Sequence, residues 1–540
     1  MPYSPAAINL FILIAALVVI SVGLYLGKRK GDARPQKISN AILIILGAVA
    51  LLSYVSFKPF STQPNNWDIF HYYIGSKYFP EIGYTRLYAC VARAEAESDD
   101  PSVTHAAKRR TLRDLETNEL VPARNYFFDE NYCKERFSAP RWESFKKDVE
   151  YFRNSLKSLW DLAQLDHGFN PSPVWILPGG LASSMISLSD DAVAGLVLID
   201  VILLFACVAC LAWAFGLPVA AFATIASLAS GGIDWAWVGG GMLRLDWFFM
   251  AVLSICLMKR EHYLLAGAAL GYAASVRVFP AIFALGPFIG LAYALYKRQQ
   301  EQKTVYLKFF AGMAVSAVTL MIAVAAVYGT DSLRKFADNT RKHSSVVSTN
   351  NVGLRTVLTY SPETAVKKTI DTRAQEAHLY WKWEAAKAKA KQKIVPLYVA
   401  IVAACLLLYI PAVISSSPWQ AIALGATFIP FAWSEMSNYY YMFLMMVAAL
   451  FATHKKTAFP LLAIGIATWV GKLYEIDVNK YFEPAAALAP PPGLGMDEVY
   501  TLFSAAVCIG FLAIWWQVSS PAMTLKNIFS ASCKDKNTAA

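Results

Sequence analysis

Charged residues are scarce in this sequence. They make up 16% of its 540 residues, whereas hydrophobic residues make up 56%. Soluble domains carry about 25% charged and about 45–50% apolar residues. The shortage of charge therefore excludes an ordinary soluble enzyme and a disordered regulator. Eight cysteines in a chain of this length are also too few for a disulfide-rich scaffold.

Motifs for nucleotides, nucleic acids and metals are missing as well. There is no glycine-rich dinucleotide fingerprint and no cluster of His, Cys, Asp or Glu with metal-ligand spacing. We therefore expect no metal and no bound cofactor. The net charge is +11, but the basic residues lie between apolar segments, as they do in the cytoplasmic loops of membrane proteins. We expect no nucleic-acid partner.

Long apolar runs fill about half of the chain. A helix needs about 20 such residues to cross a bilayer, and about 13 or 14 stretches approach that length. The first of them, 7–26, is followed rather than preceded by Lys28, Arg29 and Lys30, the reverse of a signal peptide. We expect an all-α polytopic protein of the cytoplasmic membrane whose N-terminus lies outside.

The apolar segments divide the chain into six predicted parts. They are two N-terminal transmembrane helices (1–57), a large helical extracytoplasmic loop (58–172), a transmembrane core (173–328), an extracytoplasmic basic loop with a surface helix (329–393), C-terminal transmembrane helices (394–518) and a cytoplasmic tail (519–540). Within the large loop, helical periodicity predicts helices over 103–120 and 141–165.

Two points of this topology stay open. The sides of the membrane alternate correctly only if one segment between 173 and 243 is re-entrant or broken, and the glycines between 231 and 241 favour a break there. In addition, five lysines between Lys382 and Lys393 run directly into the helix at Ile394, although lysines normally collect on the cytoplasmic side. Either a basic helix lies on the outer surface or this loop is cytoplasmic.

Only two cysteines, Cys90 and Cys133, fall in the predicted outer loop. Disulfides form in that compartment. The two residues either form a bridge or remain buried thiols.

Three sets of charged residues lie at the predicted outer ends of helices, where unpaired charge is costly. Asp68 shares a helical face with His71, and its carboxylate is a candidate general base. Arg277 lies between two apolar segments and is a candidate phosphate ligand. Arg244 and Asp246 form the third set. Structural explanations also stay open: a helix cap for Asp68, a snorkelling side chain for Arg277 and a local Arg244–Asp246 ion pair.

Four stretches resemble the C-type (GT-C) membrane glycosyltransferase superfamily, and most of all glycosyltransferase family 87 (DUF2029). They are 65–73 around Asp68, 169–173 with the sequence FNPSP, 266–280 with Arg277 near its end, and 350–355 with the sequence NNVGLR. The resemblance covers most of 40–446. The family often has Lys where Arg277 stands, and this chain adds an N-terminal helix and a longer first outer loop.

The resemblance implies a GT-C-like bundle that transfers a sugar with inversion from a polyprenyl-phosphate carrier on the outer face of the membrane. The sugar would be a hexose, mannose-like, or a pentose, and the acceptor a glycolipid or glycan. Asp68 would be the catalytic base. The residues implied to hold the donor phosphate are Arg277, Arg355, Arg244, His343 and His71. Those implied to line the sugar or acceptor pocket are Trp67, Asn351, Glu435 and Tyr440.

Two other functions fit the same sequence. A transporter or flippase for a lipid-linked sugar would place its functional charges near the middle of the membrane, whereas here they gather at the predicted outer side. A non-catalytic scaffold for envelope assembly would not depend on any single carboxylate.

Overall fold

Seven helices in the described part of the chain are long and apolar enough to cross a membrane. The computed structural model describes residues 5–30, 34–56, 64–127, 129, 132–233, 235, 239–344, 346–370, 380–433, 435–476 and 493–519. The seven spans are α1 (Pro5–Lys30), α2 (Arg34–Ser56), α11 (Asp190–Phe215), η6 with α16 (Phe279–Ala284 and Leu285–Tyr296), α17 (Gln300–Tyr328), α22 (Val395–Ile414) and α27 (Met496–Val518). The chain is therefore an all-α, multi-pass membrane protein.

The other apolar segments form shorter helices that are largely enclosed by their neighbours. Almost every residue of α12 is buried, so this helix has little contact with lipid. These shorter helices are α10 (Pro173–Met185), α12 (Leu217–Leu228), α14 (Asp246–Lys259), α15 (Tyr263–Val276), α23 (Pro418–Thr427), α24 (Ile429–Ala432), η9 (Asn438–Phe443), α25 (Leu444–Ala448), η10 (Ala449–Ala452), η11 (Lys455–Thr457) and α26 (Ala458–Leu473). The expected 13 or 14 spans stay a prediction.

The helical bundle is broken at the glycine-rich stretch, as the sequence suggested. The short helix α12 ends at Leu228, and α14 begins only at Asp246. Gly240, between them, has φ +74°, a backbone conformation that residues with a side chain rarely adopt. Residues 239–245, before α14, are therefore not helical.

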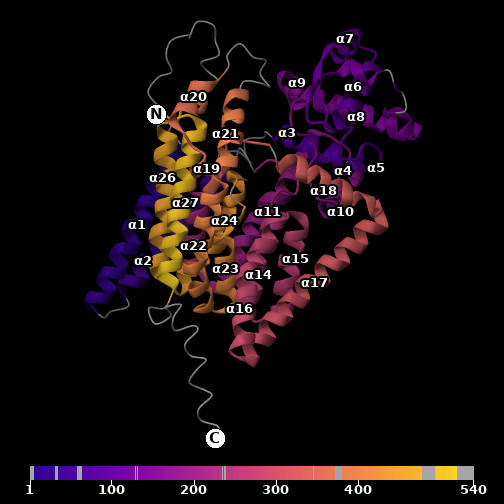
Figure 1. The fold of residues 1–540 in the computed structure, drawn as a ribbon. Helices are drawn as coiled ribbons and strands as arrows, with labels where there is room; N and C mark the ends of the chain where they lie inside the picture. Colours follow the sequence, from indigo (N-terminus) through magenta and orange to yellow (C-terminus); the bar gives the residue numbers. More distant parts are fainter. Residues whose placement is uncertain are drawn as a thin grey trace.

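Residues 64–172, here called the loop domain, cover one end of the bundle (Figure 1). Its elements are α3 (Asn66–Ile69), η1 (Phe70–Ile74), α4 (Gly75–Lys77), α5 (Phe79–Ile82), α6 (Leu87–Ala96), α7 (Pro101–Arg109), β1 (Thr111–Arg113), β2 (Leu120–Pro122), η2 (Ala123–Tyr126), η4 (Lys134–Arg136), α8 (Ala139–Leu156), η5 (Lys157–Leu159) and α9 (Trp160–Ala163). A disulfide joins Cys90 on α6 to Cys133. Its core is aromatic, with Phe70 against both Phe152 and Trp160.

The predicted helix over 103–120 is wrong beyond Arg109. The chain instead forms an antiparallel pair of strands, in which Thr111 faces Pro122 and Arg113 faces Leu120. Asp114 starts the turn between them by accepting a hydrogen bond from the Glu116 amide. Asp and Asn side chains make such local bonds in turns and thereby compete with helix formation.

Two glycines allow α15 and α17 to pack with their backbones in contact. A Cβ atom at Gly267 would lie 1.8 Å from the Phe309 carbonyl oxygen, and one at Gly312 would lie 1.9 Å from that of Leu264. In lipid no hydrophobic effect drives helices together, and small residues at a helix crossing let the two backbones approach closely enough for van der Waals contact. This contact fixes α15, and with it Arg277 at its end.

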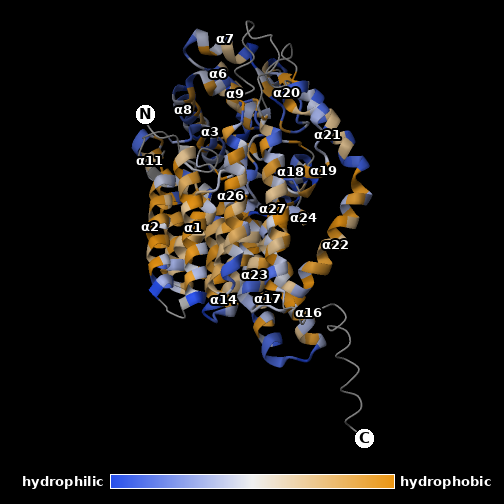
Figure 2. Ribbon diagram, turned by 90° about the vertical axis from the view of Figure 1, so that its left-hand side faces the viewer, coloured by the Kyte–Doolittle hydropathy of each residue, from blue (hydrophilic) through white to orange (hydrophobic). Residues whose placement is uncertain are grey.

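The segment after α17 returns to the end of the bundle that carries the loop domain (Figure 1). It contains α18 (Asp331–Ser344), β3 (Asn351–Val352), α19 (Leu354–Leu358), η7 (Pro362–Thr364), α20 (Val366–Thr369) and α21 (Trp381–Lys393). Strand β3 pairs with β4 (Met436–Ser437). A surface helix is expected from about 362 to 393; the structure has a helix only over part of that range, α21, which continues through Ile394 into α22, and its place on the outer surface stays a prediction. The predicted tail after Ser519 lies outside the described residues. Figure 2 shows apolar residues through the middle of the bundle and polar residues toward both ends.

Candidate active site

A cavity of about 920 Å³ lies between the loop domain and the adjoining end of the bundle. It brings together all the residues proposed for the catalytic base, the donor phosphate and the sugar or acceptor pocket, from six separate segments of the chain, but not Asp246. These residues are Trp67, Asp68, His71, Arg244, Arg277, His343, Asn351, Arg355, Glu435 and Tyr440. A cavity of this volume is in the range of small-molecule binding sites.

Asp68 is positioned by its own helix and by the glycine-rich break. The Asn65 side chain caps α3 by accepting a hydrogen bond from the Asp68 amide, at 3.2 Å. The Asn65 amide in turn donates to the Gly240 carbonyl at 2.9 Å. A Cβ atom at Gly240 would lie 2.9 Å from that same amide nitrogen, so a glycine is needed for this approach.

Arg244 pairs with Asp68 and not with Asp246. Its Nη1 lies 3.1 Å from Asp68 Oδ2, and both side chains are mostly buried, at 8% and 20% exposure. Asp246 instead accepts a hydrogen bond from the Tyr272 hydroxyl at 3.1 Å. The local Arg244–Asp246 ion pair considered from the sequence is therefore wrong. Both residues lie beside the break, but their side chains find partners on different elements.

A residue that the sequence analysis missed holds Arg244 in place. Asp200 on α11 is fully buried and accepts the backbone amides of Arg244 and Leu245, each at 3.0 Å. An acidic residue in the middle of a 26-residue apolar helix was a signal that could have indicated it. Arg244 and Leu245 lie in the non-helical segment before α14, so their amides have no carbonyl partner within a helix. The Asp200 carboxylate accepts their hydrogen bonds instead.

Arg277 lies beside Arg244, and Tyr72 separates the two guanidinium groups. Arg277 Nη2 donates to the Tyr72 hydroxyl at 3.0 Å. The Tyr72 ring centroid is 4.7 Å from the central guanidinium carbon of Arg244 and 5.9 Å from that of Arg277. Arg277 is buried, and within the described residues its Nε has no hydrogen-bond partner. Two adjacent buried cations with a free donor form a site suited to an anion.

The short β3–β4 pair brings a second group of candidates to the cavity. Asn351 lies opposite Ser437 in this pair. Ser437 is close in the chain to Glu435 and Tyr440. Glu435 Oε2 forms an ion pair of 2.8 Å with Lys391 of α21.

Arg355, on α19, lies with its guanidinium carbon 4.4 Å from the Tyr398 ring centroid. Because it lines the cavity without a carboxylate partner among the described residues, Arg355 adds to the positive charge there.

The two ring nitrogens of His71 already have partners inside the protein. Its Nδ1 lies 2.7 Å from the Trp67 carbonyl oxygen, which can only accept, so Nδ1 carries the proton. Its Nε2 then accepts from the Tyr88 hydroxyl at 2.7 Å. His71 thus fixes Trp67, whose Nε1 donates to Asp166 at 2.8 Å. A donor-phosphate contact through His71 stays a prediction.

His343 faces His167 across the cavity, with ring centroids 5.8 Å apart. Burial, together with the neighbouring His167 and Lys342, lowers the pKa of His343 to about 4. Burial and Arg113 also lower the pKa of His167. Both imidazoles are therefore neutral near pH 7, where each offers one N–H donor without adding charge. Neither Asp166 nor His167 stood out in the sequence, because no spacing pattern marks them.

Three carboxylates, three arginines and several aromatic rings line the cavity. Within the described ranges, no three His, Cys, Asp or Glu side chains gather in a metal-binding arrangement. Such a site can hold an anion on the arginines while a carboxylate accepts a proton a few ångströms away. No family model, no curated protein and no solved structure matches this chain.

Proposed function

We propose that the protein is an inverting glycosyltransferase that moves a sugar from a polyprenyl-phosphate carrier to a hydroxyl of a glycolipid or glycan. The observation that supports it most is the pair of buried guanidinium groups, Arg244 and Arg277, beside the carboxylate of Asp68 in one wide cavity. A multi-pass fold supports this proposal, because the donor that it requires is anchored in the bilayer.

In the proposed reaction, the donor phosphate lies against Arg277, with Arg244 and Arg355 completing its surroundings. Asp68 takes the proton from the acceptor hydroxyl as that oxygen attacks the anomeric carbon. The bond between the anomeric carbon and the phosphate oxygen breaks on the opposite face, and the polyprenyl phosphate leaves with the electron pair. Arginines stabilise the charge that develops on this leaving oxygen.

The ion pair between Arg244 and Asp68 gives the donor a further role. A phosphate that draws the Arg244 guanidinium toward itself would release the Asp68 carboxylate for the acceptor. Arg277 has an unused Nε–H, so it can bind the phosphate without giving up its bond to Tyr72. The aromatic residues Trp67 and Tyr440 offer ring faces for the sugars.

The proposal is tested with the purified full-length protein, a panel of labelled polyprenyl-phosphate sugars and a lipid extract as acceptor. Formation of a new glycoside by the wild type, and its loss in Asp68→Asn, is expected. Asp338→Asn serves as control, because this exposed aspartate on α18 forms its ion pair with Arg341 at the surface. Movement of the donor across proteoliposomes without any glycoside would favour the flippase instead.

A further inference from the structure

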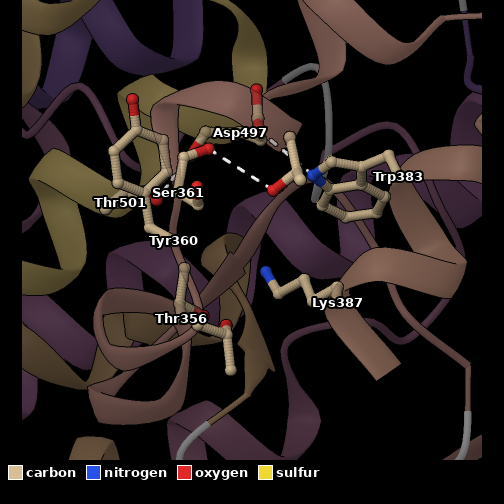
Figure 3. Close-up of a pocket in the computed structure, with 9 residues that line it drawn as sticks. Thr356, Tyr360, Ser361, Trp383, Lys387, Asp497 and Thr501 are labelled. Carbon is tan, nitrogen blue, oxygen red and sulfur yellow. Dashed lines mark hydrogen bonds between the residues drawn. The ribbon is translucent and has the colours of Figure 1, made fainter. Parts of the chain in front are cut away.

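Helix α21 has two different faces, and the side chains of the inward face contact other residues of the protein. Trp383, Lys387 and Lys391 follow one another at intervals of four and form its inward stripe. Lys391 pairs with Glu435. Trp383 Nε1 donates to Asp497 of α27 at 3.2 Å. Figure 3 shows Lys387 and Trp383 at one small polar pocket with Asp497.

The opposite face of α21 carries lysines as well. Lys382, Lys389 and Lys393 are exposed and lie seven and then four residues apart. At 3.6 residues per turn this spacing places all three in one narrow stripe. A stripe of solvated lysines is common on the helices of soluble proteins. Whether this one has a function depends on the surface next to it.

This lysine stripe continues directly into a surface that contacts lipid. The helical hydrogen bonds run from α21 into α22 through Ile394, whose amide donates to the Ala390 carbonyl at 3.1 Å and whose carbonyl accepts the Tyr398 amide at 2.8 Å. The same helical phase therefore extends to Leu397 and Leu407, four and fourteen residues after Lys393, which are both exposed on the membrane-spanning α22. Figure 2 shows the polar α21 passing into the apolar α22.

The position of the stripe along the membrane normal follows from this continuity. Lys393 lies two residues before Val395, where the membrane-spanning α22 begins, which is about 3 Å along a helix axis, and Lys389 lies about 9 Å before it. The headgroup layer on each side of the hydrocarbon core is about 5–8 Å thick. Lys393 thus stands at the headgroup level and Lys389 just above it, at the end of the bundle that carries the loop domain.

We propose that the exposed face of α21, through Lys389 and Lys393, binds the phosphate headgroups of anionic lipids in the leaflet beside the cavity. Each lysine near such a surface strengthens binding appreciably, whereas a zwitterionic headgroup offers no net charge to attract it. Binding to anionic lipids would also explain why lysines directly precede the membrane-spanning α22, whichever side of the membrane this end of the bundle faces. The proposal goes beyond the proposed transfer reaction and does not require it.

The test uses full-length protein in a neutral detergent, titrated with phosphatidylglycerol or phosphatidylcholine and followed by native mass spectrometry. The double variant Lys389→Gln/Lys393→Gln keeps good helix formers at both positions. The matched control is Lys108→Gln/Arg109→Gln on α7, which removes two exposed cations far from the bundle. A third arm adds inorganic phosphate as competitor.

The α21 variant should bind phosphatidylglycerol about tenfold more weakly or worse, given the attraction contributed by each lysine. The control should stay within about twofold of the wild type, and phosphatidylcholine binding should not change. Equal loss in both variants would overturn the proposal, as would unchanged binding in the α21 variant. Full displacement by millimolar inorganic phosphate would also overturn it, because it would show a site for a free anion. No sugar transfer is measured, so failure here is separate from failure of the transferase proposal.

Discussion

The guanidinium group of Arg244 lies 3.1 Å from the carboxylate of Asp68, and this ion pair joins the loop domain to the broken segment of the bundle. Both groups are largely buried, so removing either one leaves an uncompensated charge. Breaking a buried pair in this way typically costs about 3–5 kcal/mol. Each substitution at this pair therefore needs a measurement of folding beside any measurement of activity.

Asp68→Asn should abolish sugar transfer while the protein still folds, because the amide keeps the shape of the carboxylate but cannot accept the proton. We expect turnover to fall by about 100- to 10,000-fold, the usual contribution of a general base. Transfer rates and size-exclusion profiles in detergent check this. Near-normal turnover by a well-folded Asn variant would show that Asp68 is not the general base.

Arg277→Lys should retain part of the activity, and Arg277→Ala should lose most of it. Lysine supplies the charge as a point, whereas arginine can hold two phosphate oxygens at once. Donor affinity should weaken as well as turnover, because the phosphate is charged before and after transfer. Affinity of folded Arg277→Ala for labelled polyprenyl-phosphate sugar is the measurement. An unchanged affinity would leave Arg277 with only a structural role.

Asp200→Asn should weaken the hydrogen bonds that position the backbone of Arg244, although Asp200 itself does not line the cavity. An amide oxygen can accept from one of the Arg244 and Leu245 amides, while its NH₂ group faces the other. An unsatisfied buried amide costs about 1–3 kcal/mol. Thermal unfolding in detergent should show the loss, and donor affinity should fall with it. Asp191→Asn, at the exposed start of the same helix, is the control and should change neither.

The lowered pKa of His343 should make the folded protein less stable as the pH falls into the mildly acidic range. Its pKa in the folded protein is about 4, below the usual 6.5, so the unfolded chain takes up a proton first as the pH falls. The stabilising contribution is complete above pH 6.5 and is lost as the pH falls toward 4. Wild type should therefore lose more thermal stability between pH 7 and pH 4.5 than His343→Gln does. His105→Gln, at an exposed position on α7, should behave like wild type; equal losses in all three proteins would contradict this assignment.

The disulfide between Cys90 and Cys133 should stabilise the loop domain. It closes a loop of 43 residues, for which chain entropy predicts about 4 kcal/mol. Peptide mapping without reduction should show the linked pair, and Cys90→Ser/Cys133→Ser should become sensitive to proteolysis within this domain. Cys210→Ser, which removes a free thiol from α11, provides the comparison. Free thiols at both positions in untreated protein would refute the bridge.

Much of the candidate site could be predicted because its residues break the local apolar pattern. Asp68 and Arg277 stand out as charges at the ends of apolar segments, and both line the cavity. Asp166 and Lys391 could not be found in this way. Asp166 lies in a polar loop, and Lys391 is one of several lysines in a short basic helix, so neither is unusual among its neighbours. Their roles come from the residues that they meet, Trp67 and Glu435.

The sequence by itself determined that this chain is an all-α, multi-pass membrane protein and favoured a break among the glycines between 231 and 241, because hydropathy and glycine content act locally, one segment at a time. Only the tertiary structure decided that Arg244 pairs with Asp68, that Asp200 holds the Arg244 backbone and that Lys391 meets Glu435. An ion pair depends on a distance of a few ångströms between side chains. That distance is set by how remote helices pack, which the hydropathy of each separate segment does not contain.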